Sequence, residues 1–293
     1  MERKSRVIDQ KFAAFCYAIA LCVSTLLSSI VALGVKDKGN LYIYLSFLLP
    51  QIGYIGVFAY AYFIRYGKRG SDFLAKSDVK PLHYVWALLI GLGVFFFALL
   101  PNFYLQKLMT LLGSSATVVL PTFNGPWDYV LCTLLICVLP CVGEEVIFRK
   151  AFCDGMSEVA DYKTILLCGA LFSLSHLNLA QTVHQFFIGC LLGYVYVKTK
   201  NVTLTMIIHF INNLFALYTE KVTSVEFWQS PVVLGVSMVI GAALLIGGLL
   251  PLILSKTNKL DNNKKGKISV ITYILIGVLA LAWAINVGLS FAG

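Results

Sequence analysis

The sequence predicts an all-α polytopic membrane protein, a bundle of about eight to nine transmembrane helices, and three observations support this fold class. First, 59% of the 293 residues are hydrophobic and only 13% are charged, against about half and about a quarter in an ordinary soluble domain. Second, long apolar runs recur along the chain. Third, the basic residues gather in alternate connections between these runs. The composition excludes a soluble globular enzyme and a disordered chain.

The apolar runs give the expected helices. Crossing the hydrocarbon core takes about 20 apolar residues, and each of the first two runs supplies about 24. Irregular alternation and many Leu, Ala and Gly residues favour helices over a barrel. The expected spans are 12–35, 41–64, 82–100, 127–148, 165–176, 183–197, 202–218, 232–254 and 270–291, of which the middle ones are short and more polar.

The basic residues predict the orientation. Lys and Arg number 23 against 14 Asp and Glu, a formal net charge of +9. Nucleic-acid-binding proteins can show such an excess, but its placement between apolar runs indicates membrane orientation, so we expect no nucleic-acid partner. With a cytoplasmic N-terminus, about 19 basic residues lie inside and four lie outside, namely Lys36, Lys38, Lys107 and Lys221. We therefore expect an odd number of spans, a C-terminus outside and a place in the cell membrane.

Ionisable side chains inside apolar runs are costly, which makes each one a candidate functional residue. Glu144 and Glu145 stand together near the end of an expected span. Glu145 and Arg149 are four residues apart on a helix, so they share a face and can form an ion pair. Glu144 points about 100° away without that partner, which suits a general base in a poorly solvated site. The alternative is that both glutamates only mark the helix end at the membrane surface.

Two other expected spans carry a histidine in an apolar setting. His176 follows Phe172 by four residues, and Asn213 follows His209 by four, so each pair shares a helix face. A single histidine in a helix more often packs or forms a hydrogen bond than catalyses a reaction. Two histidines and a carboxylate pair on different spans of one bundle favour a functional site.

The remaining polar residues of these spans are expected to be structural. His83 and His184 lie near span ends without comparable partners, and Asn212 faces away from His209. The sequence also lacks the G-x-S-x-G, P-loop and H-E-x-x-H patterns. Serine hydrolases, P-loop transporters and zincins are therefore disfavoured.

The candidate residues suit hydrolysis by an activated water. Glu144 would take a proton from the water, His176 would help to hold it, and His209 with Asn213 could donate hydrogen bonds to the oxyanion. Alternatively, Glu144, His176 and His209 could bind a divalent metal such as zinc, because a catalytic site needs three such ligands and one open position. The residues themselves leave both mechanisms open.

Three motifs in this order resemble the CPBP family, the CAAX proteases and bacteriocin-processing enzymes. They are E-E-x-x-x-R at 144–149, F-x-x-x-H at 172–176 and H-x-x-x-N at 209–213. The resemblance covers 127–218, so we expect N-terminal helices over 1–126, a catalytic core over 127–218 and C-terminal helices over 219–293. It implies about eight helices around an intramembrane catalytic cavity that opens toward the cytoplasm.

The resemblance also implies roles for the site residues. Glu144 is the base, Glu145 with Arg149 is structural or assisting, His176 contacts the water, and His209 with Asn213 stabilises the oxyanion. Members of the family are described both as metal-dependent and as metal-free. For these residues to meet, the helix with Glu144 should continue to about Gly155, and the connection after His176 should dip into the protein.

The function implied by the resemblance is that of an intramembrane endopeptidase. Its partners would be the lipid bilayer and a membrane-associated peptide or lipidated protein, of the prenylated CAAX or bacteriocin type. One alternative is a non-catalytic membrane scaffold or bacteriocin self-immunity protein of the same fold. Another is a secondary transporter that couples protons through the buried carboxylates.

Overall fold

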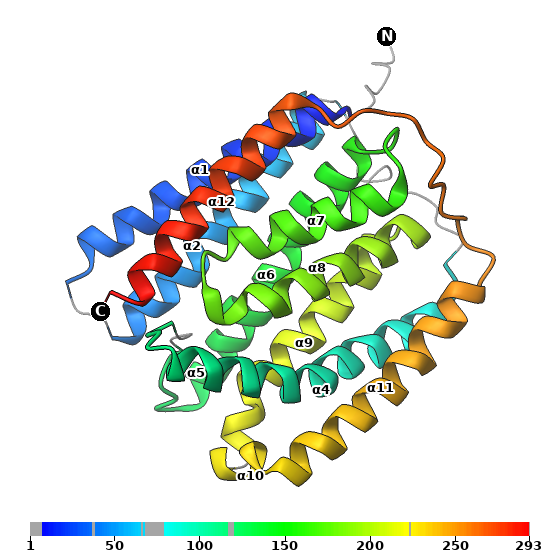
Figure 1. Ribbon diagram of the computed structural model, residues 1–293. Helices are drawn as coiled ribbons and strands as arrows, with labels where there is room; N and C mark the ends of the chain where they lie inside the picture. Colours follow the sequence, from blue (N-terminus) through cyan, green and yellow to red (C-terminus); the bar gives the residue numbers. More distant parts are fainter. Residues whose placement is uncertain are drawn as a thin grey trace.

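Long helices make up most of the chain in the computed structural model (Figure 1). The structure describes residues 8–36, 39–65, 67, 79–116, 120–222 and 224–292. In this part of the chain there is no strand, and one isolated antiparallel bridge joins Val159 to Lys265. The helices are α1 (Gln10–Gly34), α2 (Asn40–Ala59), η1 (Tyr60–Arg65), α4 (Pro81–Leu111), α5 (Pro126–Cys132), η2 (Thr133–Val138), α6 (Leu139–Glu145), η3 (Val146–Cys153), α7 (Asp161–Ser175), α8 (Leu179–Thr199), α9 (Val202–Val222), α10 (Val225–Gln229), α11 (Pro231–Leu254) and α12 (Val270–Ser290), where η marks π-helical segments.

Seven helices of the described chain are long and apolar enough to cross a membrane, which confirms the all-α polytopic class. These spans are Gln10–Gly34, Asn40–Ile64, Pro81–Leu111, Pro126–Cys153, Val202–Thr219, Pro231–Leu254 and Val270–Ser290. About eight to nine spans were expected, and the described residues contain seven that meet the requirements of length and composition. The two extra spans correspond to α7, whose 15 residues rise only about 22 Å, and to α8, which carries polar residues in its first turns.

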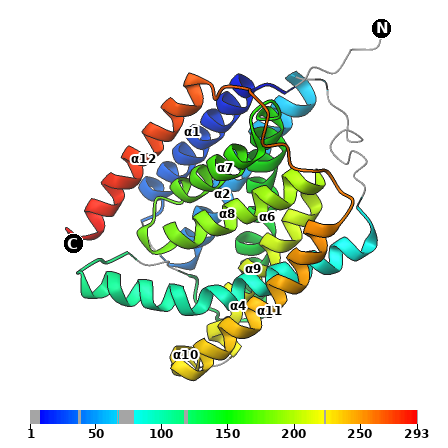
Figure 2. The ribbon, with the colours of Figure 1, turned by 45° about the vertical axis from the view of Figure 1, so that its right-hand side comes forward.

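The helices α7 and α8 form a hairpin that lies side by side with α9 in both views of the bundle (Figures 1 and 2). Three residues, 176–178, connect them. Removing both helices of a hairpin from the count changes it by two. Seven spans and nine spans therefore both place the two termini on opposite sides of the membrane. The orientation therefore stays a prediction. The basic residues at 3–6 and 68–76, Lys38 and the side chains of Arg65 and Lys221 lie outside the described residues.

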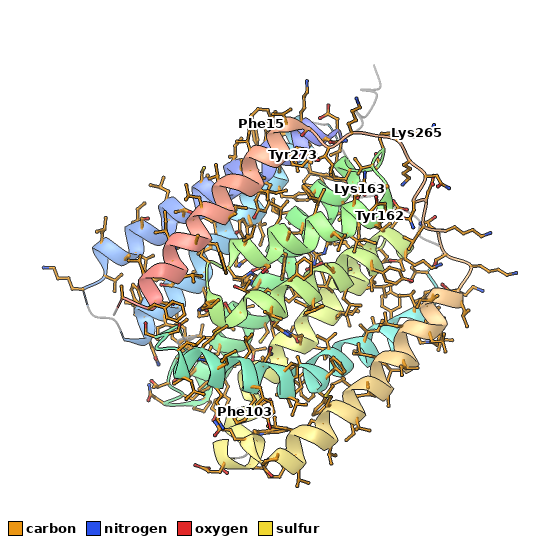
Figure 3. All side chains as sticks on the ribbon, in the orientation of Figure 1. Phe15, Phe103, Tyr162, Lys163, Lys265 and Tyr273 are labelled. Atoms are coloured by element: carbon orange, nitrogen blue, oxygen red, sulfur yellow. The ribbon has the colours of Figure 1, made fainter. Side chains whose placement is uncertain are left out.

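The connections gather at two ends of the bundle. At one end, Gln10 Nε2 donates to the Lys267 carbonyl at 2.9 Å, so α1 and α12 begin side by side. The segment 255–269 runs past the start of α7, where Lys264 Nζ lies 2.7 Å from Asp161 Oδ1. Figure 3 shows Lys265 and Lys163 at this same end. At the other end, Ser115 N donates to the Ser290 carbonyl. The lysine-rich segment 256–267 thus shares an end with the start of α1, in line with the charge pattern.

The residues 126–155 form one continuous helix through α5, η2, α6 and η3. This result confirms the expectation that the helix with Glu144 continues to about Gly155. The π-helical segments before and after α6 are of a kind often found at functional sites. The helix passes through the largest buried cluster, where the ring of Phe148 packs against Tyr17 on one side and Phe172 on the other.

Glycines let α4 and α11 pack closely. A Cβ added at Gly93 would lie 2.7 Å from the backbone nitrogen of Leu245. A Cβ added at Gly241 would overlap the backbone nitrogen of Phe97. A substitution at Gly241 must therefore move backbone, whereas Gly235, on the same helix, has no atom within 4 Å of an added Cβ.

We expect Gly241→Ala to lower the free energy of unfolding by about 1–3 kcal/mol, because the methyl group would separate α4 from α11. Gly235→Ala is the matched control, and it should be neutral or stabilise by up to about 1 kcal/mol through helix propensity. Thermal unfolding in detergent measures both. Equal midpoint shifts for the two variants would contradict the close packing at Gly241.

Candidate active site

A buried ion pair lies at the centre of the candidate site. Arg149 Nε lies 3.1 Å from Glu145 Oε2, and both side chains are 0% exposed. The two residues stand four apart across the junction of α6 and η3, as their spacing predicts. The guanidinium also lies 5.1 Å from the ring centroid of Phe172 and donates from Nη1 to the Cys168 sulfur at 3.3 Å. Aromatic and sulfur contacts thus support a charge that is removed from water.

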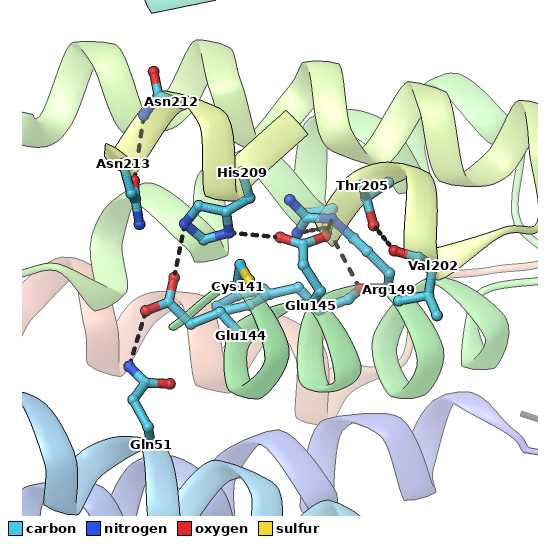
Figure 4. Close-up of polar contacts among 12 residues, drawn as sticks. Gln51, Cys141, Glu144, Glu145, Arg149, Val202, Thr205, His209, Asn212 and Asn213 are labelled. Carbon is cyan, nitrogen blue, oxygen red and sulfur yellow. Dashed lines mark hydrogen bonds and ion pairs between the residues drawn. The ribbon is translucent and has the colours of Figure 1, made fainter. Parts of the chain in front are cut away.

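The second oxygen of Glu145 holds His209, which α9 brings to the site. His209 Nδ1 lies 3.0 Å from Glu145 Oε1, and this contact fixes the plane of the imidazole (Figure 4). The other ring nitrogen, Nε2, faces Glu144 and lies 3.9 Å from its Oε2. When the imidazole is protonated, both nitrogens are donors. Nε2 can then donate to an oxygen atom placed beside Glu144.

Glu144 has a different environment from its neighbour. Its side chain is 12% exposed, and its Oε1 accepts a hydrogen bond from Gln51 Nε2 at 3.1 Å. Its Oε2 has no hydrogen-bond partner among the described residues. This buried oxygen faces His209 and lies 3.9 Å from its Nε2.

Two asparagines of α9 lie beside this group (Figure 4). Asn213, one turn after His209, donates from Nδ2 to the Ile136 carbonyl at 3.3 Å. Asn212 donates from Nδ2 to Asn213 Oδ1 at 3.3 Å. Asn212, expected to pack or to bond to backbone, thus orients the amide of its neighbour.

His176 lies at the end of α7, and the ring of Phe172 lies between it and His209. Its Nδ1 is 2.7 Å from the Phe172 carbonyl, which leaves Nε2 free to accept. The Phe172 ring packs against His176 at 5.0 Å and against His209 at 5.8 Å between centroids. No direct hydrogen bond between His176 and Glu144 occurs in the described part of the chain, so a contact between them requires an intervening molecule.

Two further residues near the site were not predicted to be functional. His184 on α8 lies close to His176 and His209, with a side-chain hydrogen bond to Asn212, although its place near an expected span end suggested a structural residue. Gln51 on α2 was not singled out. Its only sequence signal is an amide side chain within the apolar run 41–64.

A metal site requires its ligands to converge on one point, and the candidate ligands meet this requirement only in part. Glu144 and His209 face each other, and Glu145 behind His209 resembles the carboxylate that orients many metal-bound histidines. However, the described residues contain no group of three His, Cys, Asp or Glu side chains that could hold a metal ion. The set Glu144, His176 and His209 therefore does not form a three-ligand metal group in the described part of the chain.

The fold and the site define a polytopic membrane protein whose carboxylates, imidazoles and amides meet in the interior of a helical bundle. This combination is typical of intramembrane hydrolases. Residues 126–215 match the family model described as Type II CAAX prenyl endopeptidase Rce1-like, a match that contains all three motifs. It confirms the resemblance to the CAAX proteases. Comparisons with curated proteins and with solved structures give no match.

The buried ion pair leads to a prediction about stability. Arg149→Met leaves the Glu145 carboxylate buried without its cation, so we expect the free energy of unfolding to fall by about 3–5 kcal/mol. The double variant Glu145→Gln, Arg149→Met should lose less, because no charge is left uncompensated. Lys264→Met, at the more exposed pair with Asp161, serves as the control and should cost at most about 1 kcal/mol. Thermal unfolding of the purified variants ranks their stabilities. A larger loss of stability in the double variant than in Arg149→Met would contradict the prediction.

Proposed function

We propose that the protein is an intramembrane endopeptidase in which Glu144 activates the attacking water. The observation that carries this proposal is the approach of Glu144 Oε2 to His209 Nε2, which are 3.9 Å apart with Glu145 fixing the far side of the imidazole. A base and a hydrogen-bond donor thus lie side by side. The family match supports peptide hydrolysis as the reaction.

The residues would act in one sequence of proton transfers. Glu144 Oε2 takes a proton from the water, and the resulting hydroxide attacks the carbonyl carbon of the scissile peptide bond. The negative charge that forms on the carbonyl oxygen accepts hydrogen bonds from His209 Nε2 and Asn213 Nδ2. Glu144 then returns the proton to the leaving amine nitrogen. His176 would hold the water through Nε2.

A membrane-associated substrate fits the depth of the site. Glu144 lies nine residues before the end of η3 at Cys153, or about 14 Å along the helix. For a span that ends at Cys153, the peptide bond must reach below the membrane surface. A lipid anchor on a CAAX-type protein would hold the substrate at the bilayer and supply part of its binding free energy, at about 0.8 kcal/mol for each buried methylene group.

Glu144→Gln tests the proposed base. The amide keeps the shape of the side chain but cannot take a proton, so we expect kcat to fall by about 100- to 10,000-fold. The assay is cleavage of a prenylated CAAX peptide by the protein in liposomes. Glu158→Gln, which changes an exposed side chain in the connection before α7, is the matched control and should keep wild-type activity. Wild-type turnover by Glu144→Gln would overturn the assignment of Glu144 as the base, and a folded wild-type protein that cleaves no peptide would favour a scaffold.

Treatment with a chelator tests the metal alternative. Because the candidate ligands do not form a group of three, we expect 1,10-phenanthroline to change the rate less than about twofold, in contrast to enzymes that use a zinc-activated water. Loss of activity that added zinc restores would contradict this expectation and show that the reaction requires a metal.

A further inference from the structure

Gln51 is a buried polar residue outside the segment that matches the family model. It lies on α2 and is 6% exposed, within a helix of otherwise mainly apolar residues. Burial of an amide in an apolar environment is unfavourable unless hydrogen bonds offset it. The contacts of Gln51 therefore need a specific explanation.

The two ends of the Gln51 amide meet two neighbouring residues of α6. Its Nε2 donates to Glu144 Oε1 at 3.1 Å, and Figure 4 shows Gln51 approaching Glu144 from α2. Its Oε1 has no hydrogen-bond partner among the described residues and lies so close to Gly143 that an added Cβ there would overlap it. The glycine before Glu144 thus leaves the space that the amide occupies.

Close packing of α1 against α2 holds Gln51 at this position. Ser24 Oγ donates to the carbonyl of Pro50, the residue before Gln51, at 2.9 Å. A Cβ added at Gly53 would lie 2.8 Å from the same Ser24 oxygen. The two helices therefore approach each other closely on both sides of Gln51, which holds the backbone of this residue beside α6.

We propose that Gln51 is a positioning residue for Glu144, an inference that rests on the proposed function. Its amide binds Oε1 and thereby stops rotation of the carboxylate, so that Oε2 stays turned toward His209 and the reacting water. The N-terminal helices are then part of the site, although the motifs lie on other helices. A positioning role predicts a loss of turnover without a matching loss of substrate binding.

Gln51→Met tests this role, because methionine has a similar volume but no amide donor. We expect kcat for the prenylated peptide to fall about 10- to 100-fold, as for other small displacements of a catalytic group, while KM changes less than about twofold. Phe58→Leu, a buried substitution on the same helix, is the matched control. It should lower the unfolding midpoint and leave kcat unchanged. A wild-type kcat for Gln51→Met, or an equal loss of kcat in Phe58→Leu, would overturn the role.

Gly143→Ala reaches the same contact from the other side. The added methyl group should push the amide of Gln51 away from Glu144 and lower kcat about as much as Gln51→Met does. In a Gln51→Ala background the methyl group meets no amide, so the second substitution should change kcat less than about twofold. Additive losses in the double variant would overturn the shared contact.

The outcomes for Gln51 and for the proposed function are separable. If the wild type cleaves the peptide, Glu144→Gln does not, and Gln51→Met has the wild-type kcat, the peptidase stands and the positioning role is overturned. If the wild type cleaves no peptide while its fold is intact, the proposed function fails, and the role of Gln51 fails with it.

Discussion

The candidate site depends on the ion pair between Glu145 and Arg149. Each charge alone would be strongly unfavourable in the interior of a membrane bundle, and their attraction offsets that cost only with good geometry. The two charges lie 3.1 Å apart with both side chains fully buried, although neither Glu145 Oε2 nor Arg149 Nε makes a hydrogen bond among the described residues. Glu145 also binds His209 from α9, and Arg149 lies over Phe172 from α7. An interaction within one helix thus sets the positions of side chains on two others.

The same pair explains why adjacent carboxylates differ. Glu145 uses both oxygens for protein contacts, whereas Glu144 keeps an oxygen without a protein partner beside His209. The helix rotates successive side chains by about 100°, so one glutamate points into the core and the other toward the partly open side. Two residues of identical chemistry can therefore serve as a structural anchor and as a candidate base.

Much of this arrangement could be predicted from the sequence, because its main interactions are local. The pairs Glu145 with Arg149 and His209 with Asn213 follow from helical spacing, and the continuation of the helix to about Gly155 follows from chain geometry. The contact of Gln51 with Glu144 could not be predicted, since 93 residues separate them and a single glutamine forms no pattern. The α7–α8 hairpin is not among the seven candidate spans because α7 has only 15 residues and the first turns of α8 are polar.

The hairpin of α7 and α8 bears on how such a chain enters a membrane during synthesis. Neither helix is both long and apolar enough to pass from the translocon into lipid by itself, in contrast to the helices before and after it. Stable placement of the hairpin therefore requires the earlier helix 126–155 and the later helix α9 as a protein lining. His176 on the hairpin and His209 on α9 would consequently meet only after the ribosome has passed α9, so the nascent chain would carry an incomplete site through most of its translation.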